Sequence, residues 1–315
     1  MQPNVKYITD FPPAEGYKYT AELWHRQHGN AFVVINCKAS NIYYPEHWTP
    51  LSIKCAFNGK EFYKLRNTTY AVSDRNFLVL NEGTEYSSYI LTETVTESFT
   101  LNFTQNNLHI LATVENSKDN MLLDDPFTLK NSTTTFVQKL YTWSPGITSL
   151  ILKLKENSHI HKTDVFRVHE LLYALLKELF GLNKLSGSEA DTINARKKST
   201  REELYKRLNI AKDYLISCYQ EDISLDQLAK TCHLNPYHLL REFKKFYRTT
   251  PHQYLTAIRL QEARNLMWNS DKKISEIIHE VGLQDAASFS KLFKKQFGLA
   301  PSALRKLASD DNNQL

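Results

Sequence analysis

Two kinds of hydrophobic pattern divide the chain. Up to about residue 145, short runs rich in β-branched and aromatic residues alternate with polar turn residues, which is typical of antiparallel strands. The clearest runs are residues 31–37, 51–57, 77–80 and 97–104. Asn58-Gly59 follows the second run and is a strong hairpin signal. Many short strands separated by polar turns predict an antiparallel sandwich or barrel.

From residue 147 the hydrophobic period changes to that of helices. Residues 163–180 predict a helix that Thr163 or Asp164 can cap, with apolar residues at alternating three- and four-residue steps. This apolar seam consists of Val165, Val168, Leu172, Leu175 and Leu179. Its spacing suits a dimer contact with a second copy of the chain, and packing on the domain's own sheet is the alternative.

A polar segment without hydrophobic periodicity follows the seam. We predict a flexible linker at residues 183–200, between a first domain at 1–182, which contains the strand-rich part and the apolar seam, and a helical domain at 201–308. Residues 309–315 form a short polar tail.

The helical part contains a repeated unit, which indicates a repeated structural motif. Phe-Lys-Lys occurs at 243–245 and again at 293–295, and the residues before each copy also match. Each copy predicts a short helix, a turn and a second helix, with N-caps at Ser224, Asn235 and Asp285. Such a helix-turn-helix presents its second helix to the major groove of DNA.

The charge distribution favours a nucleic-acid partner for the same part. Residues 196–308 carry 21 Lys and Arg against 12 Asp and Glu, whereas the whole chain has a net charge of only +5. A basic domain attracts polyanions, although a lysine-rich surface that only promotes solubility is the alternative reading of charge alone. Two similar helical hairpins within the basic part favour DNA binding.

The first recognition helix separates into a core stripe and an exposed face. Leu239 and Phe243 are expected to face inward, as are Phe289 and Phe293 in the second copy. Arg241 is the strongest candidate for reading a base, because a guanidinium group can form two hydrogen bonds with guanine. The predicted phosphate contacts are Lys244, Lys245, Lys294 and Lys295, with solvated charge as the alternative.

From about Arg201 to Lys306 the chain resembles the AraC/XylS family of bacterial transcription regulators. The resemblance rests on "ISLDQLA", "NPYHLLREFKK", "RLQEAR", "ISEII", "VGLQDAASFSKLFKKQFG" and "APSALRK". It implies a seven-helix domain in which a long helix joins two helix-turn-helix motifs. His233, Ile278 and Leu283 depart from the usual Gly, Ala and Phe of the family, which implies local backbone adjustment and repacking. The expected base contacts are Pro236, Tyr237, Leu240, Arg241, Ala287, Ser288 and Lys291.

Regulators of this family often carry an N-terminal cupin-like barrel followed by helices, and the strand-rich part is loosely similar. The predicted fold class is therefore α+β: an N-terminal cupin-like antiparallel β domain with helices, then an all-α domain with two helix-turn-helix motifs. Aromatic side chains could line an effector pocket, with core or surface positions as the alternative. The candidates are Tyr43, Tyr44, His47, Trp48, Tyr63 and Tyr86. The isolated His47 and the pair His159 and His161 lack the clustered spacing of a cupin metal site, so we expect no metal and no cofactor.

The combined interpretation is a cytoplasmic, sequence-specific DNA-binding transcription regulator controlled by a small-molecule effector. A regulator without a ligand, controlled by a protein partner or by its abundance, is the alternative. The expected partners are double-stranded DNA, RNA polymerase and a second copy of the chain, and no membrane. The chain has no nucleophile elbow, phosphate loop or zinc motif, so we expect no catalytic residue and no enzyme. A nucleoid-packaging protein is the third class, which the two different recognition helices disfavour.

Overall fold

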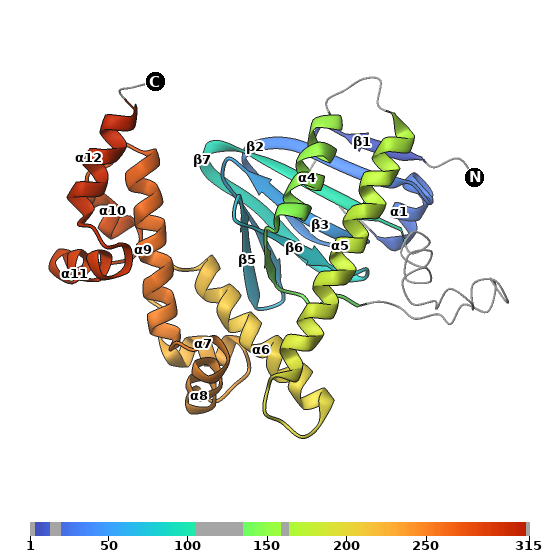
Figure 1. Cartoon of the computed structure of the whole chain (residues 1–315). Helices are drawn as coiled ribbons and strands as arrows, with labels where there is room; N and C mark the ends of the chain where they lie inside the picture. The colour runs from blue at the N-terminus through green and yellow to red at the C-terminus, as the bar shows by residue number, and fades with distance from the viewer. Residues whose placement is uncertain (1–3, 13–19, 105–134, 159–163, 313–315) are drawn as a thin grey trace. The chain divides into compact units, whose positions relative to one another are not determined.

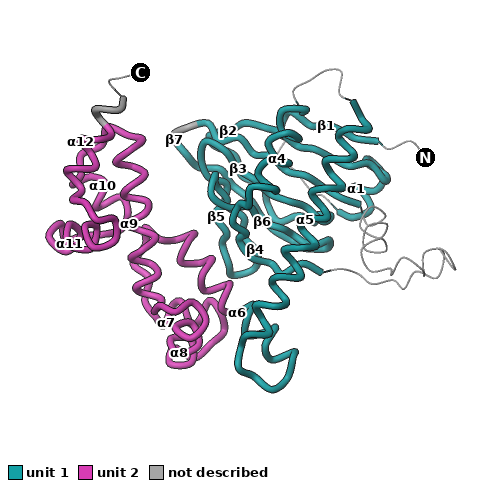
Figure 2. The backbone as a smooth tube through the Cα atoms, viewed as in Figure 1, with its two compact units in different colours: residues 1–206 teal, residues 207–315 magenta. Residues whose placement is uncertain are grey.

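The computed structural model describes residues 4–12, 20–104, 135–158 and 164–312 of the 315-residue chain. The described residues form two compact units, residues 1–206 and residues 207–315 (Figure 2). Among the described residues, no helix combines the length and the apolar character needed to cross a membrane.

The first unit is built on a sheet that closes into a barrel (Figure 1). Its strands are β1 (Val5–Ile8), β2 (Phe32–Thr49), β3 (Leu51–Phe57), β4 (Lys60–Leu65), β5 (Thr68–Ser73), β6 (Asn76–Leu80), β7 (Thr84–Phe103) and β8 (Leu140–Thr142). The order is β1-β2-β7-β3-β6-β5-β4, and β7 closes the ring by pairing with β3 along 97–103 and with β4 along 87–89. Every pair is antiparallel except β1 with β2, so the predicted antiparallel β domain is confirmed.

The turn at Asn58-Gly59 differs from its prediction. It lies between β3 and β4, which are not hydrogen-bonded neighbours. Both strands run antiparallel to β7, so the chain continues along β7 instead of turning back on itself. Asn58 has a φ of 61°, and a Cβ at Gly59 would come within 2.0 Å of the Thr96 hydroxyl oxygen on β7. The two residues therefore form a tight bend beside β7, and the predicted hairpin is wrong.

Three helices complete the described part of the first unit, namely α1 (Ala21–His28), α4 (Pro145–Asn157) and α5 (Val165–Asp191). Figure 1 shows α4 and α5 lying over one face of the sheet. Asp164 caps α5 by accepting hydrogen bonds from the backbone N–H groups of Phe166 and Arg167. The other predicted cap, Thr163, lies outside the described residues.

The apolar seam of α5 is used inside the domain. Val168, Leu172, Leu175 and Leu179 are each at most 1% exposed and share one core with residues of the sheet and of α4. Only Val165 is exposed, at 40%. Packing on the domain's own sheet is therefore the arrangement found, because a second copy cannot reach the four buried side chains in the folded domain. The predicted dimer contact itself remains a prediction.

The segment predicted as a linker is largely helical. α5 continues to Asp191, and residues 192–197 separate it from α6 (Lys198–Ser217). Ser186 and Ala190 extend the buried face of α5 beyond the seam. The Asn183 amide oxygen accepts a hydrogen bond from the Val137 backbone N–H at 3.2 Å. The domain boundaries proposed from the sequence remain a prediction.

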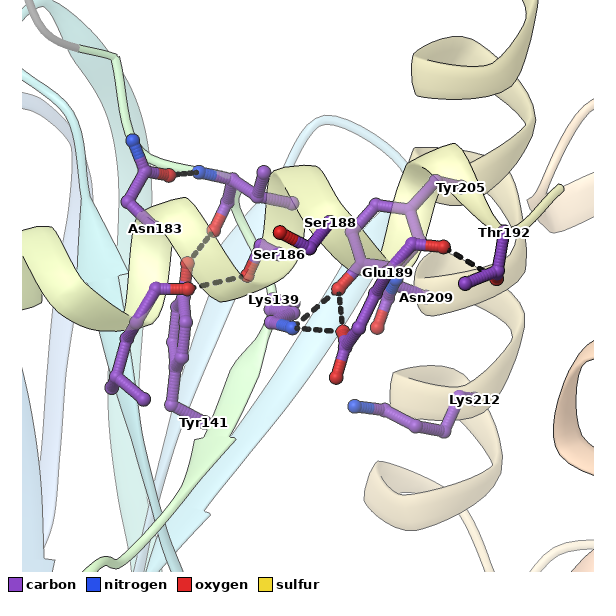
Figure 3. A network of polar contacts seen from close by, with 12 residues as sticks. Lys139, Tyr141, Asn183, Ser186, Ser188, Glu189, Thr192, Tyr205, Asn209 and Lys212 are labelled. Carbon is purple, nitrogen blue, oxygen red and sulfur yellow. Dashed lines mark hydrogen bonds and ion pairs between the residues drawn. The ribbon is translucent and has the colours of Figure 1, made fainter.

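Polar contacts also join α5 to the start of α6 (Figure 3). The Lys139 ammonium group donates to the Tyr205 hydroxyl at 2.6 Å and lies 3.4 Å from a Glu189 carboxylate oxygen. The Tyr205 hydroxyl in turn donates to Glu189. Arg201 contacts the Asp191 carboxylate at 2.8 Å. The beginning of α6 is thereby attached to the first unit.

The second unit is all helical, as predicted. After α6 come α7 (Leu225–Thr231), α8 (Pro236–Tyr247), α9 (Pro251–Asn269), α10 (Ile274–Glu280), α11 (Ala286–Phe297) and α12 (Pro301–Asn312). The predicted N-caps Ser224, Asn235 and Asp285 each accept hydrogen bonds from backbone N–H groups of the helix that follows. The second unit thus contains two helix-turn-helix motifs joined by the long helix α9, and the predicted all-α domain is confirmed.

The first motif contains a strained turn residue. His233 has a φ of 54°, whereas Gly282, with a φ of 79°, occupies the turn of the second motif. A residue with a side chain in the left-handed region costs about 1–2 kcal/mol, which a glycine would avoid. The larger conformational entropy of glycine in the unfolded chain offsets part of this stabilisation. We expect His233→Gly to raise the free energy of unfolding of the second unit by roughly 0.5–1 kcal/mol. Urea denaturation measures this, His233→Ala is the control that keeps a Cβ, and equal stabilities of the two variants would contradict the prediction.

Candidate nucleic-acid interface

Helix α8 has one buried and one exposed face. Leu239 and Phe243 are fully buried, and the Phe243 ring packs against the rings of Tyr247 and Tyr254 at 4.6 and 5.7 Å. Tyr237 lies on the opposite face and is 73% exposed. The predicted core stripe is therefore confirmed, and the face that carries Tyr237 is exposed to solvent.

Helix α11 repeats this division. Phe289 and Phe293 are buried against the unit's core. The predicted contacts on α11 are all exposed, namely Ala287, Ser288, Lys291, Lys294 and Lys295. On α8 the predicted contacts Tyr237, Leu240, Arg241, Lys244 and Lys245 are exposed and Pro236 is half-buried. Both recognition helices thus present the predicted residues on their solvent side, while the contacts themselves remain a prediction.

An acidic residue on α8 was not identified from the sequence. The Glu242 carboxylate accepts a hydrogen bond from Arg241 Nε at 2.7 Å, lies 3.4 Å from Lys245 Nζ and lies 3.9 Å from His238 Nε2. Burial would raise the pKa of Glu242, but the hydrogen bond from Arg241 and the positive charge of Lys245 outweigh it and lower the pKa. The signal in the sequence was the spacing of His238, Glu242 and Lys245, which places them on one side of a helix.

The two motifs are held together by contacts within the second unit. Arg259 on α9 donates to the backbone carbonyl oxygens of Tyr219 and Glu221, both at 2.7 Å. The Gln220 side-chain amide donates to the Glu280 carbonyl oxygen at 3.0 Å. The loop before α7 is therefore attached to the end of α10, which fixes the two recognition helices relative to each other.

Comparison with known proteins supports this geometry. Residues 228–307, which span both motifs, match a family described as a helix-turn-helix domain. The lactose operon transcription activator of Staphylococcus xylosus is 30% identical over 172 residues, which are 54% of this chain and 57% of that protein. The raffinose operon transcriptional regulatory protein of Pediococcus pentosaceus is 29% identical over 167 residues, which are 49% of this chain and 58% of that protein. Residues 228–307 are an AraC-type helix-turn-helix domain.

The extent of these similarities is limited to part of each protein. The chain spans just over half the length of the two relatives named above. A solved AraC-type regulator from Chromobacterium violaceum is 26% identical and has a TM-score of 0.31, covering 32% of this chain and 91% of that chain. The matched helix-turn-helix family likewise covers only residues 228–307 of the chain.

Four of the six candidate effector residues of the first unit form one group of aromatic contacts. Tyr44, His47, Tyr63 and Tyr86 lie together, with ring centroids 6.2 Å apart for the first pair, 4.3 Å for His47 and Tyr86, and 5.6 Å for Tyr63 and Tyr86. Tyr43 does not join them, because it alternates to the other side of β2 and is 58% exposed. The Trp48 ring lies 6.1 Å from the ring of His25 on α1.

The aromatic group surrounds two buried charged residues that the sequence analysis missed. The Lys54 ammonium group donates to the Tyr86 hydroxyl at 2.8 Å and lies 4.8 Å from the centroid of that ring. Burial lowers the pKa of Lys54 to about 8, although the nearby Glu61 carboxylate favours the charged form. Burial also raises the pKa of Glu61, against hydrogen bonds from Ser98 and Tyr63. The signal for Lys54 was a lysine at the centre of an otherwise apolar strand.

The barrel group combines aromatic ring faces with buried polar and charged groups. Burial lowers the pKa of His47 to about 4, so the imidazole is neutral at pH 7. Glu61 is 5% exposed, and its Oε2 atom has no hydrogen-bond partner among the described residues. A buried acceptor without a partner is costly and is normally satisfied by a ligand or by ordered water. Across the described residues, no three His, Cys, Asp or Glu side chains are grouped so that they could hold a metal ion. His159 and His161 lie outside the described residues.

Proposed function

We propose that the chain is a sequence-specific DNA-binding transcription regulator controlled by a small-molecule effector bound in its N-terminal barrel. The observation that carries the DNA-binding part is the pair of exposed recognition helices, α8 and α11, on one unit whose halves are fixed by Arg259 and Gln220. The relatives named above are regulators of operons, which supports a regulatory function. A cytoplasmic location is part of the same proposal. RNA polymerase and a second copy of the chain are proposed as further partners.

The two recognition helices should read a bipartite DNA site. Two helix-turn-helix units on one body reach successive major grooves when their half-sites lie one helical turn, about 34 Å, apart on one face of the duplex. Arg241 and Tyr237 are proposed to read bases from α8, and the small side chains of Ala287 and Ser288 should make the α11 half less selective. Sequencing DNA fragments selected by the purified protein tests this proposal, and a single contiguous core of three or four bases would contradict it.

Substitution of a proposed base-reading residue and of a proposed phosphate contact should have different effects. We expect Arg241→Ala to weaken binding to the selected site by roughly 1–3 kcal/mol and to relax the preference at one base position. Lys295→Ala should weaken binding to all sequences and reduce the slope of log affinity against log salt by about one. Fluorescence anisotropy on selected and random duplexes measures both, and equal losses on both duplexes for both variants would contradict the assigned roles.

The effector is proposed to bind in the barrel beside Tyr86, Lys54 and Glu61. The unpartnered Glu61 oxygen accepts hydrogen bonds, the Lys54 ammonium donates them, and the tyrosine rings provide apolar faces, so a small molecule with several hydroxyl groups fits this chemistry. Two relatives are named for lactose and raffinose operons, which supports testing sugars first. A regulator without a ligand is the alternative.

A matched pair of variants tests the effector proposal. Melting of the purified chain is followed with a panel of sugars and sugar alcohols. A ligand that raises the melting temperature of the wild type should have little effect on Glu61→Gln, because the amide removes one acceptor, while the exposed control Glu85→Gln should respond normally. If no ligand and no metabolite extract raises the melting temperature of the wild type, the alternative without an effector is favoured.

A further inference from the structure

We propose that Glu242 is a positioning residue for base reading by α8: it orients the Arg241 guanidinium group and withholds positive charge from the DNA backbone. This inference rests on the proposed DNA-reading function of α8. The proposal concerns a residue that does not itself need to touch DNA, and it predicts effects on sequence discrimination rather than on affinity alone.

The geometry of the pair leaves the reading end of Arg241 available. Glu242 Oε1 accepts from Arg241 Nε at 2.7 Å. The two terminal nitrogens lie at the outer end of a guanidinium group. Together they can donate two hydrogen bonds to guanine, which presents the acceptors O6 and N7 in the major groove. The Glu242 side chain is 11% exposed and that of Arg241 is 51% exposed, so the carboxylate lies at the base and the guanidinium group reaches outward. A hydrogen bond to Nε fixes the plane of the planar group before DNA arrives.

The same carboxylate reduces the positive charge that α8 offers to phosphates. Lys245 lies 3.4 Å from Glu242, and His238 lies 3.9 Å from it. Because Glu242 stays ionised at neutral pH beside Arg241 and Lys245, it offsets part of their attraction for any polyanion. Attraction to phosphates carries no sequence information, so weakening it raises the ratio of specific to non-specific binding.

The second motif provides an internal comparison. At the offset of 50 residues between the Phe-Lys-Lys copies, Lys291, Leu292 and Lys295 correspond to Arg241, Glu242 and Lys245. Leu292 is 39% exposed and cannot bind a cation as a carboxylate does. The asymmetry means that α8 carries a positioned arginine beside an acid, whereas α11 carries lysines without one at the matching position. The first motif should therefore discriminate bases, and the second should mainly hold the backbone.

Glu242→Gln tests the inference because it removes the charge and keeps the shape of the side chain. Binding is measured by anisotropy on the selected site, on its single-base variants and on random DNA over a salt series. We expect affinity for random DNA to rise roughly threefold to tenfold and the salt slope to steepen by about one. The preference at the base read by Arg241 should fall about fivefold to tenfold, with the other positions unchanged.

Two further variants separate the charge from the positioning. Glu242→Asp keeps the charge and shortens the reach, so it should lower the preference at the same base while leaving random-DNA affinity close to that of the wild type. Asp271→Asn removes a negative charge from an exposed loop of the same unit and should leave the base preference unchanged. Circular dichroism confirms folding of each variant.

The outcomes distinguish this inference from the proposed function. If the wild type selects no preferred sequence, the proposed function itself fails. If the wild type selects a site and Glu242→Gln keeps its full preference at every base, the inference is overturned. A loss spread equally over all base positions would also overturn it, because that is the result expected of a purely structural residue.

Discussion

Leu172→Glu is expected to unfold the first unit of the chain. Leu172 is 1% exposed in the core shared by the sheet, α4 and α5, so the substitution places a carboxylate among apolar side chains and removes an isobutyl group. Loss of the leucine packing alone costs about 2–5 kcal/mol, and burying an unpaired charge adds to it. Since single domains are stable by only about 5–15 kcal/mol, the folded state of this unit should be largely lost.

The control lies on the same helix. Phe166 is 72% exposed, so Phe166→Glu changes the charge of α5 without touching the core and should leave the unit folded. Circular dichroism melts and limited proteolysis of the full chain measure the difference, and the second unit should keep its own transition in both variants. A folded monomeric Leu172→Glu variant would contradict the prediction and would favour the seam as a contact between copies.

Gly282→Ala is expected to disrupt the second helix-turn-helix motif. A Cβ at this position would come within 2.6 Å of the Gln220 backbone oxygen, and the φ of 79° is itself unfavourable for alanine. The left-handed backbone costs about 1–2 kcal/mol, and forcing a methyl group against a backbone atom adds about 1–3 kcal/mol. Because the same loop holds the two motifs together, binding to a bipartite DNA site should weaken as well.

Gly298 provides a matched control for this substitution. It also has a φ of 79°, but a Cβ there would meet no atom within 4 Å. Gly298→Ala should therefore show the backbone cost alone, and the difference between the two variants measures the close approach to Gln220. Urea denaturation gives both values, and equal destabilisation would mean that the contact at Gly282 relaxes at no cost.

The second unit was more predictable from the sequence than the first because its signals are local. The caps Ser224, Asn235 and Asp285 each act on the N–H groups of the next turn, so the sequence contains both partners within a few residues. The inward stripes follow from helical spacing alone. The contacts of Glu242 were missed because they depend on the directions of three neighbouring side chains, which the residue types alone do not give.

The first unit depends on pairings between residues far apart in the chain. β2 and β7 are 18 and 20 residues long, much longer than the short strands predicted. Both strands continue through polar residues, and their pairing continues past register shifts at residues 39–41 and 44–47 of β2. The pairing of β3 and β4 with β7 rather than with each other is likewise non-local. The hydrogen bond from Lys54 to Tyr86 joins residues that are 32 positions apart in the chain, so no local sequence pattern predicts it.

The polar contacts around Tyr205 have a consequence for domain engineering. Tyr205 belongs to α6, which begins in the first unit and continues into the second, and its hydroxyl is held by Lys139 and Glu189. A fusion that starts the DNA-binding module at residue 201 would carry Tyr205 into a foreign protein without either partner. A chimera that keeps these contacts should therefore transplant α6 together with matching residues at positions 139 and 189.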